Sequence, residues 1–214
     1  MLRDLDSGLV PAVGITPANA PEAGVTESIS ADLNAQHARL TELHIDRAYL
    51  ASTLVRDRSD DLVIYCKAWR VRNSGGRFTK TEFRLDFDRG QLTCPHEITM
   101  SFHPGTTVRF PAQVCAGCPL RSRCTTSTAG RMIGIHPDEQ LLTELRQRQQ
   151  TPEGRAALRQ RTAVEHGLAH IGHWQGRRAR YRGTRKNLLD LRRCAVVHNL
   201  HVIARHNILD QQAA

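Results

Sequence analysis

The sequence predicts an α/β fold that is interrupted by a β-rich, cysteine-containing insertion and completed by a helical, basic C-terminal part. Three observations lead to this prediction. Residues 8–46 have the pattern strand, helix and strand, which is typical of an α/β layer. Residues 62–135 contain a series of short strand-like segments separated by turns. From residue 137 onward, the apolar residues recur at helical spacing.

The N-terminal part of the predicted core supplies two strands and the helix between them. The apolar, β-prone run GLVPAVGIT at 8–16 predicts a strand, and the TPAN segment that follows ends it. Residues 21–37 predict a helix, because their apolar residues recur at every fourth position. A short strand over 40–45 then leads directly to Asp46. We assign residues 1–58 to this part of the core.

Residues 59–136 form the predicted insertion. The run LVIYCKAW at 62–69 predicts a strand. The run FRLDFD at 83–88 alternates strictly between apolar and charged side chains, as a strand with one buried face does. We therefore expect a small antiparallel sheet here. Its further short strands are expected over 98–102, 106–110 and 131–135.

Residues 137–214 are predicted to be helices that flank one basic loop. Thr151 is a good N-cap, and Pro152 and Glu153 follow it in the first turn, where proline and acidic residues favour a helix start. The predicted elements are a helix over 137–150, a helix from 152 to about 173, a basic loop over 174–186 and a helix over 187–208.

The positive charge of the chain is concentrated near its C-terminal end. The 30 lysines and arginines outnumber the 21 acidic residues, which gives a net charge of +9. Residues 1–154 are neutral, with 18 basic and 18 acidic side chains, whereas residues 155–214 hold 12 basic and 3 acidic side chains. A neutral body with a basic C-terminal segment favours a polyanionic partner, above all nucleic acid.

No targeting or membrane-spanning segment is expected. The N-terminal residues MLRDLDSG lack the apolar run of a signal peptide. No apolar run approaches the roughly 18 residues of a transmembrane helix. We therefore expect a cytoplasmic protein without a membrane partner. Its six cysteines are then more typical of metal binding or burial than of disulfides.

Two acidic residues stand where catalytic carboxylates are expected. Asp46 ends a core strand, a place at which α/β sheets carry reactive groups, although an aspartate there can also cap a helix. Glu165 lies beside an apolar stripe in the most basic part of the chain, although it can also form an ion pair with Arg161 one turn earlier. Position alone leaves both alternatives open.

Four cysteines predict a metal site in the insertion. Cys115 and Cys118 form a C-x2-C knuckle, with Cys94 before it and Cys124 shortly after it. Four thiolates are the usual ligands of a structural Zn²⁺ ion, and a small β-rich insertion gains stability from such a site. Buried free thiols and redox chemistry are the alternatives.

The segment GRRARYRGTRK at 176–186 carries six basic side chains around one tyrosine. Such a loop can follow DNA phosphates while its aromatic side chain stacks on a base. A merely solvated loop is the alternative. The predicted DNA contacts in this loop are Arg177, Arg178, Arg180, Tyr181, Arg182, Arg185 and Lys186.

In combination, these motifs resemble the insertion-sequence DDE transposases with a ribonuclease H-like core. More narrowly, they resemble the bacterial group with a cysteine-containing insertion before the catalytic glutamate. The order of the motifs carries the resemblance, which covers nearly the whole chain. They are the TPAN segment, the strand ending in Asp46 with Tyr49 three residues on, the CAGCPLRSRC loop, TPEG, the R-x3-E pair of Arg161 and Glu165, and RRARYRG followed by AVVHNL.

The resemblance implies a partial ribonuclease H-like core and DNA cleavage and strand transfer by two-metal phosphodiester chemistry. Asp46 matches the second catalytic aspartate and Glu165 the glutamate, both of which hold Mg²⁺ or Mn²⁺, and Arg161 joins the DNA contacts. The first aspartate of the family ends an earlier strand, whereas Asp4 and Asp6 are typical of a turn. The chain thus resembles the C-terminal part of a longer transposase, and we expect it to be inactive alone.

The resemblance also implies partners. These are the DNA at the ends of an insertion sequence and either a second copy of the chain or a separate N-terminal fragment. The alternative function is a non-catalytic DNA-binding fragment that is derived from a transposase and stabilised by a structural zinc ion.

Overall fold

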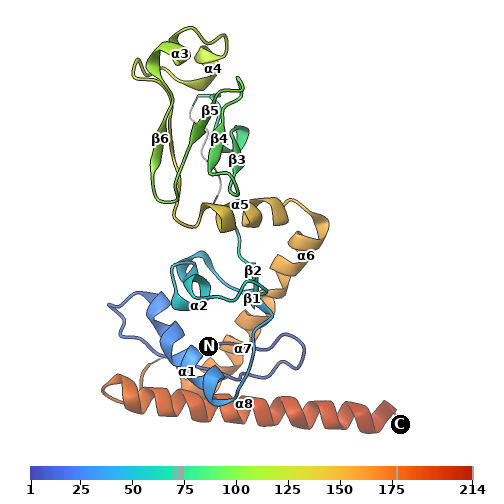
Figure 1. Cartoon of the computed structure of the whole chain (residues 1–214). Helices are drawn as coiled ribbons and strands as arrows, with labels where there is room; N and C mark the ends of the chain where they lie inside the picture. Colours follow the sequence, from blue (N-terminus) through green and yellow to red (C-terminus); the bar gives the residue numbers. More distant parts are fainter. Residues whose placement is uncertain (70, 72–74, 177, 214) are drawn as a thin grey trace. The chain divides into compact units, whose positions relative to one another are not determined.

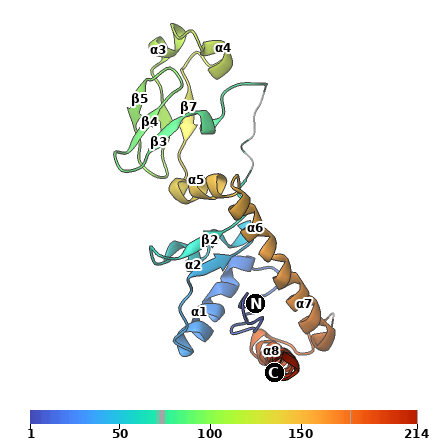
Figure 2. The same ribbon diagram turned by 90° about the vertical axis from the view of Figure 1, so that its right-hand side faces the viewer.

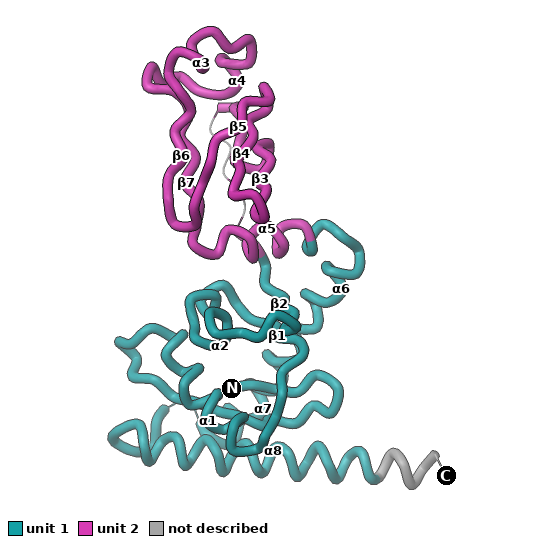
Figure 3. The backbone as a smooth tube through the Cα atoms, viewed as in Figure 1, with its two compact units in different colours: residues 1–67, 148–214 teal, residues 68–147 magenta. Residues whose placement is uncertain are grey.

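The computed structural model describes residues 1–69, 71, 75–176 and 178–213, and the side chains up to residue 207. The chain divides into two compact units, coloured teal and magenta in Figure 3: unit 1 is Met1–Lys67 with Arg148–Ala214, and unit 2 is Ala68–Gln147. Small sheets and several helices make the structure mixed α/β, as the sequence predicts. The ribonuclease H-like core and the three domain ranges stay predictions. No described helix is long and apolar enough to cross a membrane.

Unit 1 contains a two-stranded parallel sheet. Strands β1 (Glu42–His44) and β2 (Val63–Tyr65) pair in parallel, with Leu43 opposite Ile64. Both of these apolar side chains are buried. The parallel pairing requires a long connection between the two strands, and the residues between them supply it. Asp46 lies two residues after the end of β1, at the start of the next 3-10 turn.

Helices accompany this sheet in unit 1, and Figures 1 and 2 show the longest of them, α8 (Thr184–Ala213), running across the end of α7 (Thr162–Gln175). The apolar positions of the predicted 21–37 helix are buried against Ala12. Arg192 of α8 forms an ion pair with Asp32 of α1 at 2.5 Å. The helices of unit 1 are α1 (Thr26–Ala35), α2 (Thr53–Arg56), α6 (Pro152–Gln160), α7 (Thr162–Gln175) and α8 (Thr184–Ala213), with 3-10 turns at Glu22–Val25 and Arg47–Tyr49.

The predicted strand over 8–16 is wrong. This segment makes a single antiparallel bridge, between Ala12 and Leu2. The N–H group of Val10 instead donates to the Asn199 side chain at 2.8 Å, and Asn199 donates back to the Val10 carbonyl at 3.0 Å. Pro11 explains the difference, because it has no N–H group for a ladder. The Asn199 side chain thus makes the two hydrogen bonds with the Val10 backbone that a neighbouring strand would otherwise make.

The single helix predicted from residue 152 to about 173 is two helices. The predicted start is confirmed: the Thr151 side chain accepts a hydrogen bond from the Gly154 N–H at 3.0 Å, with Pro152 in the first turn. Helix α6 ends at Gln160 and α7 begins at Thr162, so Arg161 lies at their junction. Figure 2 shows the two helices following one another. Arg161 is thereby held at a fixed point between them.

Unit 2 contains two small antiparallel sheets, which agree with the predicted short strands. The sequence missed one strand, Gln91–Thr93, which pairs with both of its neighbours. The buried core between the sheets includes Phe83, Leu92 and Phe110. The elements of unit 2 are β3 (Arg84–Asp86), β4 (Gln91–Thr93), β5 (Thr99–Ser101), β6 (Thr107–Arg109), β7 (Met132–Gly134), α3 (Ala112–Ala116), α4 (Arg121–Cys124), a 3-10 turn at Lys80–Glu82 and α5 (Glu139–Arg148), whose last residue belongs to unit 1.

Candidate active site and DNA-binding surface

Asp46 follows β1 and uses its two carboxylate oxygens in different ways. The Ile45 N–H donates to the Tyr65 carbonyl at 3.0 Å, which fixes the chain just before Asp46 to β2. Oδ1 of Asp46 accepts a hydrogen bond from the Arg47 N–H at 2.6 Å and so caps a short 3-10 turn. Oδ2 contacts Nη1 of Arg161 at 2.9 Å. The capping role that the sequence left open is therefore present, and it leaves one oxygen available for ionic contact.

Glu165 lies in the first turn of α7 and approaches the same arginine. Its Oε1 atom is 3.9 Å from Nη2 of Arg161, four residues earlier. Asp46 and Glu165 are thus brought to one guanidinium group, although they are 119 residues apart in the sequence. Both carboxylates remain accessible, with side-chain exposures of 58% and 67%. Ions from solvent can therefore reach both carboxylates, although both contact the Arg161 guanidinium.

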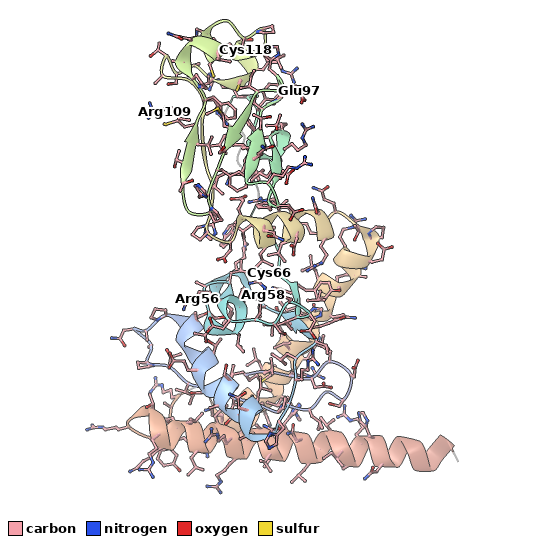
Figure 4. All side chains as sticks on the ribbon, viewed as in Figure 1. Arg56, Arg58, Cys66, Glu97, Arg109 and Cys118 are labelled. Carbon is pink, nitrogen blue, oxygen red and sulfur yellow. The ribbon has the colours of Figure 1, made fainter. Side chains whose placement is uncertain are left out.

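The surroundings of Asp46 favour its ionised form. The hydrogen bond from the Arg47 amide holds the pKa of Asp46 below its usual value, and Arg161 lowers this pKa further, although partial burial opposes the shift. Cys66, labelled in Figure 4, behaves in the opposite way. Burial raises the pKa of Cys66 to about 11, and the charge of Asp46 adds to this effect. The Cys66 thiol is therefore protonated at neutral pH.

The carboxylates of Asp46 and Glu165 have the donor chemistry for Mg²⁺ or Mn²⁺. Among the described residues, no three His, Cys, Asp or Glu side chains are placed to hold a metal ion. Magnesium is commonly held by one or two carboxylates together with water, so two acids are sufficient for one ion. Asp4 has another role, because its carboxylate accepts hydrogen bonds from the N–H and hydroxyl of Ser7, both at 2.6 Å. This is the turn that the sequence predicts there.

The predicted zinc site receives no support from the structure. Cys94, Cys115, Cys118 and Cys124 line one pocket, and Cys118 is labelled in Figure 4. A structural zinc site requires about four converging ligands, and the described residues offer no group of even three. All four cysteines are free, and three of them pack against the apolar core of unit 2. Burial also raises the pKa of the Cys124 thiol. These four cysteines are only partly buried, so the choice between a metal site and free thiols stays a prediction.

The basic loop before α8 presents cations to solvent. Arg178, Arg182, Arg185 and Lys186 are exposed and form no ion pair with the part of the chain that the structure describes. Arg180 differs, because it donates to the Trp174 carbonyl at 2.7 Å and lies 3.9 Å from Asp190. Tyr181 is 45% exposed, as a stacking residue must be. The predicted contact Arg177 lies outside the described residues.

Asn187 shapes this loop, a role that the residue pattern did not predict. Its buried side chain accepts from the Tyr181 N–H at 3.1 Å. It also donates to the carbonyls of Tyr181 at 2.6 Å and Gly183 at 2.8 Å. One side chain therefore ties the loop to the first turns of α8. The sequence carries only a weak signal of this role, namely an amide among basic residues near a helix start.

A family model described as a transposase DDE domain matches residues 91–204. This range contains the cysteine loop, Arg161, Glu165 and the basic loop, whereas Asp46 precedes it. No curated protein and no solved structure gives a significant match. The matched range is more than half of the 214 residues. The chain therefore belongs to the family of transposase DDE domains, which confirms the resemblance to insertion-sequence transposases.

Proposed function

We propose that the chain acts on DNA as an insertion-sequence transposase, with Asp46 and Glu165 as two carboxylates of its metal site. One observation carries this proposal. Asp46 follows a strand and Glu165 lies on a helix, yet both contact the guanidinium of Arg161. Because DDE enzymes use carboxylates to hold divalent cations, membership of this family makes the two neighbouring acids candidate metal ligands.

A ribonuclease H-like core is part of the same proposal. The parallel pairing of β1 and β2, the helices around them and the place of Asp46 directly after β1 support it. Reactive groups of α/β sheets gather at the carboxyl ends of parallel strands. Asp46 occupies such a position, and α7 brings Glu165 to it.

Asp46 and Glu165 would hold Mg²⁺ or Mn²⁺, which activates the attacking oxygen and stabilises the leaving oxygen of a phosphodiester when bound. The Arg47 amide fixes the Asp46 carboxylate through Oδ1 and leaves Oδ2 for the cation. The described residues place no third carboxylate beside these two. Two-ion chemistry needs a bridging carboxylate, so we propose that another polypeptide segment supplies the third acid and that the chain alone does not cleave DNA.

The proposed site predicts that the double variant Asp46→Asn, Glu165→Gln binds Mn²⁺ at least about tenfold more weakly than the native chain, because both anionic ligands are lost. Electron paramagnetic resonance of free Mn²⁺ during a titration measures this affinity. The matched control is Asp57→Asn with Glu153→Gln, which removes the same charge from exposed acids of unit 1. Equal Mn²⁺ affinity of the native chain and the Asp46, Glu165 variant would contradict the site.

A cleavage assay completes this test. The native chain, incubated with supercoiled plasmid and Mn²⁺, is expected to leave the plasmid intact. Nicking that disappears in Glu165→Gln would show that the chain cleaves DNA without a further segment, and it would support the assigned site. Nicking that persists in this variant would argue against the catalytic role of Glu165.

A DNA-binding fragment without catalysis is the second candidate function. The exposed basic loop favours it, because DNA binding needs no metal. Both candidates bind DNA, and the Mn²⁺ affinity distinguishes them. If the chain is a non-catalytic fragment, the Asp46, Glu165 double variant binds Mn²⁺ with the same affinity as the native chain. The zinc staple that was expected with this alternative has no support in the cysteine geometry.

A further inference from the structure

Arg161 occupies an unusual position for a surface arginine. It lies between α6 and α7, with backbone angles φ −54° and ψ −28°, so the backbone is helical on both sides. Its side chain is 41% exposed. The two arms of its guanidinium contact two different acids, Nη1 with Asp46 at 2.9 Å and Nη2 with Glu165 at 3.9 Å. The shorter contact joins elements that are distant in sequence.

We propose that Arg161 occupies the place of a divalent cation between Asp46 and Glu165 and is displaced when that cation binds. Arg161 then sets the metal affinity of the site by competition. This inference rests on the proposed metal site, and it adds a positioning residue whose role precedes any contact with DNA.

The geometry of Asp46 explains why the two cations compete. Oδ1 of Asp46 accepts the Arg47 N–H, so Oδ2 is the oxygen without a backbone partner and faces the side chains around it. Arg161 contacts that oxygen. A guanidinium that contacts both Asp46 and Glu165 lies where a divalent cation would approach both carboxylates to about 2.0–2.1 Å, and its positive charge repels that cation. A divalent cation and Arg161 therefore compete for the place between the two acids.

The exposure of the pair keeps the competition weak. Exposed ion pairs gain little energy, because solvent screens them and the side chains lose freedom. The pairing of Arg161 with Glu165 four residues later also has the less favourable orientation on a helix, with the basic residue first. The guanidinium thus keeps the two carboxylates together before a metal arrives, and a divalent ion can displace it.

The test is Mn²⁺ binding to Arg161→Gln, followed by electron paramagnetic resonance of free Mn²⁺. Loss of the competing cation is expected to tighten Mn²⁺ binding by about fivefold, which corresponds to the upper range for an exposed ion pair. The matched control is Arg159→Gln, which removes the same charge from an exposed arginine of α6 that pairs with no described acid. We expect this control to bind Mn²⁺ as the native chain does.

Several outcomes would overturn the inference. An unchanged or weaker Mn²⁺ affinity of Arg161→Gln would do so, and so would an equal gain in Arg159→Gln, which would indicate a general charge effect. If Arg161→Gln does not fold, as judged by circular dichroism, Arg161→Lys serves instead, because it keeps the charge but loses the two-armed contact. Tighter binding is expected for it as well. Failure of the metal site itself is recognised separately, since the Asp46, Glu165 double variant then binds Mn²⁺ as the native chain does.

Discussion

Replacing Glu139 with alanine is expected to lower the free energy of unfolding of unit 2 by about 3–5 kcal/mol. The Glu139 side chain is 1% exposed and lies between two cations. Lys80 Nζ is 2.5 Å from Oε2, Arg146 Nη1 is 3.0 Å from Oε1, and the His136 N–H donates to Oε2 at 3.0 Å. Removal of the acid leaves both cations, which are themselves largely buried, without a counter-charge.

Chemical denaturation of the full chain, followed by the circular dichroism of its transitions, measures this effect. Glu144→Ala is the matched control, because Glu144 is an exposed acid on the same helix without an ion pair to any described residue. It is expected to change the unfolding free energy by less than about 0.5 kcal/mol. A loss for Glu139→Ala as small as that of the control would show that the buried ion pairs contribute little.

The pH dependence of stability gives an independent check on Glu139. Burial raises the pKa of this carboxyl, but the hydrogen bonds from Lys80, His136 and Arg146 lower it by more, so the pKa in the folded state lies below its usual value. A lowered carboxyl pKa stabilises the protein above the unfolded pKa of about 4.3, and this contribution is lost as the pH falls through the folded pKa. Stability lost below about pH 4 should therefore be smaller in Glu139→Ala.

Substitution of Arg178, Arg182 and Arg185 together by alanine is expected to weaken DNA binding roughly a hundredfold at low salt. These side chains are exposed and unpaired among the described residues, so they are free to meet phosphates. If these three arginines and Lys186 each contact one phosphate, the slope of log K against log[salt] is expected to be near −4 for the native chain. The triple variant should flatten this slope by about 2.5.

Fluorescence anisotropy of a labelled duplex across a salt series measures both quantities. The matched control replaces Arg56, Arg89 and Arg109, which are exposed elsewhere on the chain and labelled in part in Figure 4. The same loss of three charges should then affect binding far less. A control that weakens binding as much as the loop variant would show that net charge, rather than the loop, governs the affinity.

Local signals in the sequence predicted much of the fold. The N-cap at Thr151 is set by three neighbouring residues, and the structure confirms it. The strand before Asp46 and the alternating segment that holds Phe83 also follow from local patterning. These features depend on short-range physics, in which a side chain bonds to its own helix or alternates across its own strand.

The errors arose where distant residues decide the outcome. Residues 8–16 look like a strand, but their backbone partner is Asn199, a side chain far away in the sequence. The cysteine spacing predicted that four residues meet in space, and the structure does place them around one pocket, but no zinc-binding group is found among the described residues, so the zinc site stays a prediction. The shared contact of Asp46 and Glu165 with Arg161 also needed the tertiary structure. Asp46 belongs to the first segment of unit 1, whereas Arg161 and Glu165 belong to the second.

The discontinuity of unit 1 has a consequence for the order of folding. Unit 2 is one continuous stretch, so a growing chain that emerges N-terminus first can complete it once residue 147 has left the ribosome. Residues 1–67 must wait for residues 148–214, since the bond between Val10 and Asn199 spans 189 positions. Contacts of such separation slow folding. During synthesis, the apolar segment around Val10 is thus exposed longest and most needs protection from aggregation.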